Sequence, residues 1–174
     1  MKRALFVGRF QPFHHGHFYA MKKLLKKFGE VVVVIGSSDD CNTWENPFTC
    51  GERIEMVRLC FGKGDLARIV LVPVPDINDN RIWVDHVFMH IPPVDEVYSN
   101  NPLVKMLFSK HGILVKSLDF YDRGPKEGSF IRKLMAEKNR AWAKHVPPKV
   151  VAYLDMIDAE GRINNIFRMG TRRM

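Results

Sequence analysis

Five consecutive β-branched residues at Val31–Ile35 constrain the fold of this chain more than any other feature. A strand alternates its side chains between two faces, so such a run places apolar groups on both of them. Both faces must then be covered, which is typical of a strand inside a parallel sheet. Further strands are expected at Ala4–Val7, Ile69–Val74, Glu96–Tyr98 and Ile113–Lys116.

Segments with helical periodicity separate these predicted strands. Apolar residues recur at three- and four-residue spacing over Phe18–Phe28, and Gly29 stands where a glycine cap would close that helix. Thr49–Glu52 has the spacing of a capping box, and Asn101-Pro102 combines an N-cap residue with proline at the first helical position. Ser129 is expected as the N-cap of another helix.

The end of the chain, residues 147–174, is expected to form a last helix to about Asp158 and then a basic tail. Strands and helices alternate along the chain without repeats or low-complexity linkers. That alternation predicts an α/β fold, a single-domain open parallel sheet over residues 1–174 with helices on both faces and right-handed crossovers. Ligands of such sheets bind beyond the C-terminal ends of the strands.

The charge of the chain favours an anionic partner. The chain has 27 lysine and arginine residues against 19 aspartate and glutamate residues. This excess suits nucleotides, polyphosphates or nucleic acid, although much of it is expected to solvate a helix face and the tail. Three cysteines without zinc-site spacing fit a reducing cytoplasm. The apolar runs are far shorter than the roughly 20 residues that span a bilayer.

The segment that carries the chemistry follows the first predicted strand and reads G-R-F-Q-P-F-H-H-G-H over residues 8–17. The chain has neither G-x-G-x-x-G at this point nor a P-loop motif anywhere. His14 and His17 are three residues apart, so at a helix start they share one face beside N–H groups that favour an anion. Gly16 lets a phosphate approach the backbone. The alternatives are two surface histidines, or a zinc site that lacks a third ligand.

This ten-residue segment resembles the signature of the nucleotidyltransferase superfamily marked by H/T-x-G-H. It is most similar to the archaeal type of nicotinamide mononucleotide adenylyltransferase, whose relatives carry G-R-F/M-Q-P-F-H-x-G-H after the first strand. Residues 128–132 (G-S-F-I-R) are similar to the superfamily's second motif, a Ser/Thr-rich turn followed by arginine. Shorter similar stretches, in the family's order, continue along most of the chain.

The resemblance implies a Rossmann-like fold and an enzyme that transfers AMP from ATP to nicotinamide mononucleotide, forming NAD⁺ and pyrophosphate. His14, His17 and Arg132 would be the catalytic residues, acting as hydrogen-bond donors to phosphate oxygens and not as bases. Mg²⁺ would accompany ATP on phosphates and waters, without protein ligands. The implied ATP-binding residues are Gly8, Arg9, Phe10, His14, Gly16, His17, Ser129 and Arg132.

Trp83 and Asp76 are the residues expected at the mononucleotide. Trp83 resembles the family's residue that stacks on the nicotinamide ring, where a cationic pyridinium lies over an indole face; core packing is its alternative. Asp76 has a flanking role in the same family region, or is a turn carboxylate. The family also suggests a homo-oligomer, with ATP and the mononucleotide as partners and neither nucleic acid nor a membrane.

The chain departs from the family pattern in two places. Glu45 stands where relatives carry an arginine, and residues 123–127 replace a shorter run. We expect Glu45 to point away from the substrates or to approach a cation such as Lys126 or Mg²⁺. Lys126 or Arg123 could restore the lost positive charge. The competing functions are transfer to phosphopantetheine, transfer from CTP to an alcohol phosphate, and nucleotide sensing without turnover.

Overall fold

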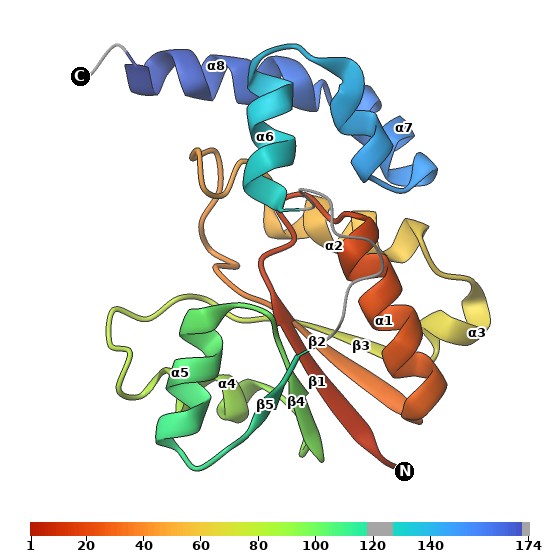
Figure 1. The fold of residues 1–174 in the computed structure, drawn as a ribbon, viewed down its shortest axis with the longest axis vertical. Helices are drawn as coiled ribbons and strands as arrows, with labels where there is room; N and C mark the ends of the chain where they lie inside the picture. Colours follow the sequence, from red (N-terminus) through yellow and green to blue (C-terminus); the bar gives the residue numbers. More distant parts are fainter. Residues whose placement is uncertain (118–126, 172–174) are drawn as a thin grey trace.

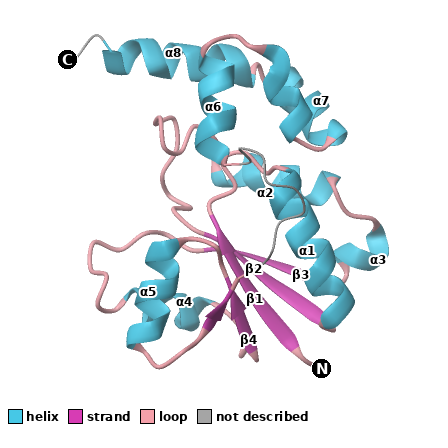
Figure 2. Cartoon of the chain, in the orientation of Figure 1, coloured by secondary structure: helices cyan, strands magenta, loops and turns pink. Residues whose placement is uncertain are grey.

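A sheet of five parallel strands forms the centre of the computed structural model, which describes residues 1–117 and 127–171 (Figure 1, Figure 2). The strand order is β3-β2-β1-β4-β5. The chain runs outward from β1 to β3 and then returns to the other side of β1. The switch in strand order therefore lies at β1, whose C-terminal end is the expected ligand position. The strands are β1 (Arg3–Gly8), β2 (Glu30–Ile35), β3 (Ile69–Pro73), β4 (Glu96–Tyr98) and β5 (Val115–Lys116).

Several helices begin where the sequence predicts, and for the predicted reason. Glu52 N donates to the Thr49 hydroxyl at 3.2 Å and Thr49 N donates to the Glu52 carboxylate at 2.9 Å, which completes the capping box. Leu103 N donates to the Asn101 side chain at 2.9 Å and so caps the helix that follows. The helices are α1 (His15–Lys27), α2 (Cys50–Leu59), α3 (Lys63–Leu66), α4 (Trp83–His90), α5 (Pro102–Lys110), α6 (Gly128–Ala136), the 3-10 helix η1 (Arg140–His145), α7 (Pro148–Met156) and α8 (Ala159–Thr171).

The sheet is apolar on both faces because helices cover both. Along β1, Ala4 and Phe6 pack into one core cluster, and Leu5 and Val7 pack into the other. β2 alternates in the same way, and residues 31–35 have no exposed surface. Helices α1 and α2 lie on one side of the sheet, and α4 and α5 lie on the other (Figure 1). The predicted parallel sheet with helices on both faces is therefore confirmed.

Two predicted helix ends are wrong. The C-cap of α1 is Phe28 in an extended conformation, so no left-handed glycine closes the helix at Gly29. The N-cap of α6 is Glu127 and not Ser129, which lies in the first turn of the helix. Arg132 consequently lies in the second turn of α6.

The C-terminal residues also differ from the predicted single helix and basic tail. After α7 ends at Met156, residues 159–171 form a further helix, α8. Arg162, expected to be solvated, donates to both oxygens of the Glu52 carboxylate at 2.7 and 2.8 Å. Helices α6, α7 and α8 lie beyond the C-terminal ends of the strands (Figure 1). No helix in residues 1–117 or 127–171 has the length and apolar character needed to cross a membrane.

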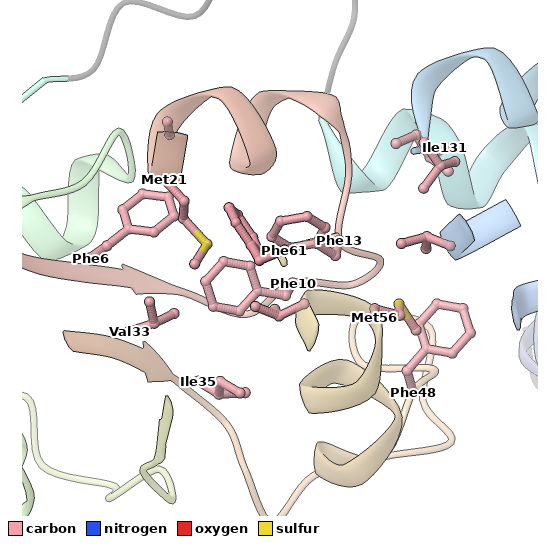
Figure 3. Packing of buried hydrophobic residues seen from close by; sticks show 14 of the residues in the cluster. Phe6, Phe10, Phe13, Met21, Val33, Ile35, Phe48, Met56, Phe61 and Ile131 are labelled. Atoms are coloured by element: carbon pink, nitrogen blue, oxygen red, sulfur yellow. The ribbon is translucent and has the colours of Figure 1, made fainter. Parts of the chain in front are cut away.

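A cluster of aromatic side chains supports the segment that follows β1. The ring centroids of Phe10 and Phe13 are 6.0 Å apart, and those of Phe13 and Phe61 are 6.4 Å apart. Figure 3 shows these three rings beside α1, with Phe48 close to Met56 of α2. Because Phe10 and Phe13 are buried, the backbone that connects β1 to α1 is anchored in the core.

Candidate active site

Residues 8–17, which we call the cradle, connect the C-terminal end of β1 to the start of α1. His14 is the N-cap of α1, and His17 lies in its first turn. The two imidazole rings are stacked, with centroids 3.6 Å apart, and His14 N lies 3.4 Å from Nδ1 of His17, to which it donates. Gly16, between them, is buried. The two histidines that the sequence pairs are therefore in direct contact.

The surroundings of His17 favour its neutral form. Its ring lies 4.7 Å from the Phe10 ring and 5.6 Å from the Phe13 ring. Burial lowers the pKa of His17 well below its usual value, and the charge of His14 lowers it further. Because Nδ1 accepts a hydrogen bond from the backbone, the proton of the neutral ring resides on Nε2. His17 is therefore suited to donate one hydrogen bond and not to carry a charge.

Arg132 of α6 reaches into the cradle. Its side chain is buried, and Nη1 donates to the backbone oxygen of Gln11 at 2.8 Å. Nε is also buried, and no acceptor for it is found among the described residues. Burial lowers the pKa of Arg132 to about 10; the nearby Arg9 lowers it as well, and Glu45 opposes the shift. A buried guanidinium that a second cation acts on, with an N–H that lacks an acceptor among the described residues, is an arrangement that an anion would stabilise.

Gly128 brings α6 against the cradle. A Cβ at this position would lie 2.8 Å from the backbone oxygen of Gln11 and 3.3 Å from Nη1 of Arg132. Any larger residue would push the helix away, so glycine is required for this close approach. Ser129 follows on the exposed side, where its hydroxyl lies 3.4 Å from the Glu127 carboxylate. The structure thus brings Arg132 onto the cradle segment that carries His14 and His17, with Ser129 exposed in the first turn of α6.

Arg53 is a residue of this region that the sequence analysis did not single out. It has no exposed surface and donates only to backbone oxygens. Nη1 binds the oxygens of Arg9 at 3.2 Å and Gly36 at 2.7 Å, and Nη2 binds Ser37 at 2.9 Å. These bonds join the cradle to the loop that follows β2. The family-like stretch that contains Arg53 was the only signal for it, because no local pattern reveals which carbonyls a buried arginine will meet.

Asp76 and Trp83, the two residues predicted at the mononucleotide, follow β3. The Ser37 hydroxyl donates to the Asp76 carboxylate at 2.5 Å, which connects Asp76 to the loop held by Arg53. Trp83 begins α4 and is half-buried, with its ring 6.0 Å from that of Phe108 in an edge-on contact. Part of Trp83 therefore packs on the core, as its alternative interpretation supposed, and part of it stays accessible.

The loop over residues 36–49 brings Glu45 and Trp44 to the site. Glu45 is exposed, and its charge opposes the lowering of the Arg132 pKa. That Glu45 points away from the substrates or approaches Lys126 or Mg²⁺ stays a prediction. The Trp44 ring lies 5.8 Å from the Arg132 guanidinium. Lys126 and Arg123, named as possible replacements for the missing arginine, lie outside the described residues. Within the described ranges, no three His, Cys, Asp or Glu side chains gather as metal ligands.

Comparison with known proteins shows the family of this chain. A family model described as cytidylyltransferase-like matches residues 5–166. The nicotinamide-nucleotide adenylyltransferase of Picrophilus torridus is 42% identical over 164 residues, which cover 94% of this chain and 96% of the relative. The protein of the same name from Archaeoglobus fulgidus is 40% identical over 169 residues, with 94% and 97% covered. The chain belongs to this adenylyltransferase family. The resemblance drawn from residues 8–17 and 128–132 is therefore confirmed.

Solved structures support the fold of this family member. The bifunctional NMN adenylyltransferase/ADP ribose pyrophosphatase of Francisella tularensis, complexed with AMP and a manganese ion, matches with a TM-score of 0.71. The match covers 98% of the chain at 19% sequence identity. The chain spans only 53% of that longer protein, so the likeness concerns one part of it. At this identity the comparison establishes a Rossmann-like fold.

Proposed function

We propose that this protein transfers the AMP group of ATP to nicotinamide mononucleotide, forming NAD⁺ and releasing pyrophosphate. The observation that carries the proposal is the cradle, where buried Arg132 donates to the Gln11 backbone oxygen close enough to Arg9 for their charges to interact, and where His17 favours its neutral form. The triphosphate of ATP supplies the anion that these groups require. The acceptor is inferred from the names of relatives that are about 40% identical over nearly the whole chain.

In this proposal the reaction needs no protein base. The second pKa of a phosphate monoester is near 6, so the 5′-phosphate of the mononucleotide is mostly ionised at neutral pH. One of its oxygens attacks the α-phosphorus of ATP. The bond from the α-phosphorus to the bridging oxygen breaks, and pyrophosphate leaves with that electron pair. His14, His17 and Arg132 donate hydrogen bonds to the oxygens on which negative charge builds up.

The remaining predicted residues have binding roles. Gly8, Arg9, Phe10, Gly16 and Ser129 complete the ATP site. Half-buried Trp83 offers an aromatic face to the cationic nicotinamide ring, and Asp76 holds the neighbouring loop through Ser37. Mg²⁺ binds with ATP through phosphates and waters. The proposal includes a homo-oligomer. It also includes a cytoplasmic location, which is consistent with the free thiols of Cys41, Cys50 and Cys60.

The test is pyrophosphate release by the purified protein with ATP, Mg²⁺ and one acceptor at a time. We expect turnover with nicotinamide mononucleotide, accompanied by NAD⁺ in equal amount. Its acid form, phosphopantetheine, and CTP with an alcohol phosphate serve as comparisons. Turnover with phosphopantetheine alone would refute the acceptor but keep the transferase chemistry, and no turnover with any pair would refute both.

A further inference from the structure

Trp44 lies between Arg132 and the C-terminal helix. Its ring is 5.8 Å from the guanidinium carbon of Arg132 and 5.4 Å from the ring of Phe167, which belongs to α8. Arg132 is therefore held on two sides, by the Gln11 backbone oxygen at Nη1 and by the indole ring. Neither contact is a hydrogen bond to Nε, for which the described residues supply no acceptor. The two contacts fix the guanidinium through the Gln11 backbone and the Trp44 ring, while Nε is buried without an acceptor among the described residues.

Helix α8 joins the two parts of the chain that meet at Trp44. Toward the Trp44 loop and α2, Arg162 donates to Glu52 and, at 3.4 Å, to the backbone oxygen of Pro47. Toward the helix that carries Arg132, Asn164 makes a buried hydrogen bond of 2.7 Å to the backbone oxygen of Ala136. α8 thus connects the Trp44 loop to α6. Phe167 extends this connection to the indole itself.

We propose that Trp44 is a positioning residue for Arg132 and that α8, through Phe167, holds Trp44 in place. The inference rests on the proposed function, because it assigns Arg132 a contact with the phosphates of ATP. A guanidinium near an indole is attracted by the ring and keeps its planar N–H groups in a fixed orientation. The same contact compensates part of the cost of burying Arg132 beside Arg9. α8 then contributes to ATP binding without touching the nucleotide.

The test is a double-mutant cycle on ATP binding, measured by titration calorimetry with the full chain. Trp44→Leu keeps an apolar side chain without a ring and should weaken ATP binding about tenfold, whereas Trp44→Phe should stay within about threefold of the wild type. In an Arg132→Ala background, Trp44→Leu should have no further effect, because Trp44 acts through Arg132. Equal losses in both backgrounds would show a general structural role and overturn the inference.

Helix α8 is tested in the same way. Phe167→Ala should weaken ATP binding about threefold, and only when Arg132 is present. Met169→Ala is the matched control, because Met169 lies on the same helix and is 68% exposed. Its ATP affinity should equal that of the wild type. An unchanged affinity in Phe167→Ala would overturn the role of α8.

Two further readouts keep the outcomes distinct. Thermal unfolding followed by circular dichroism shows whether each variant is folded; if Trp44→Leu is not, Trp44→Phe and Phe167→Ala carry the test. Because ATP binding does not depend on the acceptor, a wild type that binds ATP without making NAD⁺ would refute the proposed function and leave the positioning role of Trp44 to the ATP titrations. Wild-type ATP affinity in folded Trp44→Leu would refute the positioning role alone.

Discussion

The two ends of the parallel sheet differ in whether their positively charged side chains have carboxylate partners. At the N-terminal ends of the strands, Arg3 Nε donates to Glu30 at 2.5 Å, and the Glu96 carboxylate lies 2.9 Å from both Lys27 and Lys116. At the C-terminal end, buried Arg132 is acted on by a second arginine, Arg9, and the carboxylate that opposes this effect, Glu45, is exposed. Arg3, Lys27 and Lys116 each have a carboxylate partner, whereas Arg132 and Arg9 repel each other.

This difference indicates which end is built for a ligand. Hydrogen bonds from Tyr98, Lys116 and Lys27 lower the pKa of Glu96 to about 2, so the charges at that end satisfy one another. A buried cation without a full partner reduces the stability of the free protein, and a bound anion recovers that loss. The cost is therefore placed where the phosphates are proposed to bind. Substitutions at the two ends of the sheet test this contrast.

Replacing Arg132 should reduce activity strongly without reducing stability. Arg132→Ala should lower kcat by roughly 10²–10³-fold, the scale for losing one preorganised donor to transition-state charge. The thermal midpoint should hold or rise, because the variant removes a buried charge that lies near Arg9. Steady-state kinetics and thermal unfolding check the two parts, with exposed Lys133→Ala as the control. A large fall in the midpoint would show that Arg132 is mainly structural.

Replacing Arg53 should mainly reduce stability, because all of its hydrogen bonds go to backbone oxygens. Arg53→Met leaves these oxygens without a donor and should lower the free energy of unfolding by about 3–5 kcal/mol. Arg53→Lys, which keeps the charge and fewer donors, should lose less. Urea unfolding measures both variants. A stability close to that of the wild type would mean that water replaces the guanidinium.

The lowered pKa of His17 predicts a pH dependence of stability. In the unfolded chain a histidine titrates near its usual value of about 6.5, whereas in the folded protein burial keeps the pKa of His17 lower. Between those two values the unfolded state binds more protons, so the free energy of unfolding falls as the pH is lowered from 7 to 5. One group contributes at most about 1.4 kcal/mol per pH unit.

His17→Gln should remove this contribution. Urea unfolding at pH 7 and pH 5 should therefore give a smaller difference for the variant than for the wild type. A steeper loss in the variant would contradict the neutral His17. If the free energy of unfolding depends on pH equally in the wild type and in His17→Gln, the dependence comes from other titrating groups.

The smallest expected effect comes from removing one carboxylate at each end of the sheet. Glu45→Gln takes away a negative charge that competes with phosphate for Arg132, so the KM for ATP should fall about twofold to threefold at low salt. Glu96→Gln, at the opposite end, should leave kcat and both KM values unchanged. A weaker affinity for ATP in Glu45→Gln would show that Glu45 supports a needed cation, as one of the initial expectations allowed.

The sequence predicted the fold in detail because its signals are local or periodic. The run at Val31–Ile35 can be satisfied only by burial on both faces, and Thr49 to Glu52 cap their own helix. The errors fall where local signals are ambiguous. Ser129 has the side chain of an N-cap, but α6 begins at Gly128, two residues earlier than an N-cap at Ser129 would give, where Gly128 lies close to the Gln11 backbone.

The sequence alone identified His14, His17 and Arg132 as candidate residues and placed the two histidines at the start of one helix. Their catalytic roles remain predictions. Only the tertiary structure decided how these residues are poised. The neutral state of His17 depends on burial beside Phe10 and Phe13, and the lowered pKa of Arg132 depends on burial and on Arg9. Gln11 and Trp44 hold the Arg132 guanidinium in place. The helix at residues 159–171 was not predicted, because the sequence shows no partner for Arg162 and suggests a solvated charge. Its partner, Glu52, is 110 residues earlier in the chain, and only the fold brings the two together. Electrostatic energies depend on burial and on distances across the fold, which no local pattern encodes.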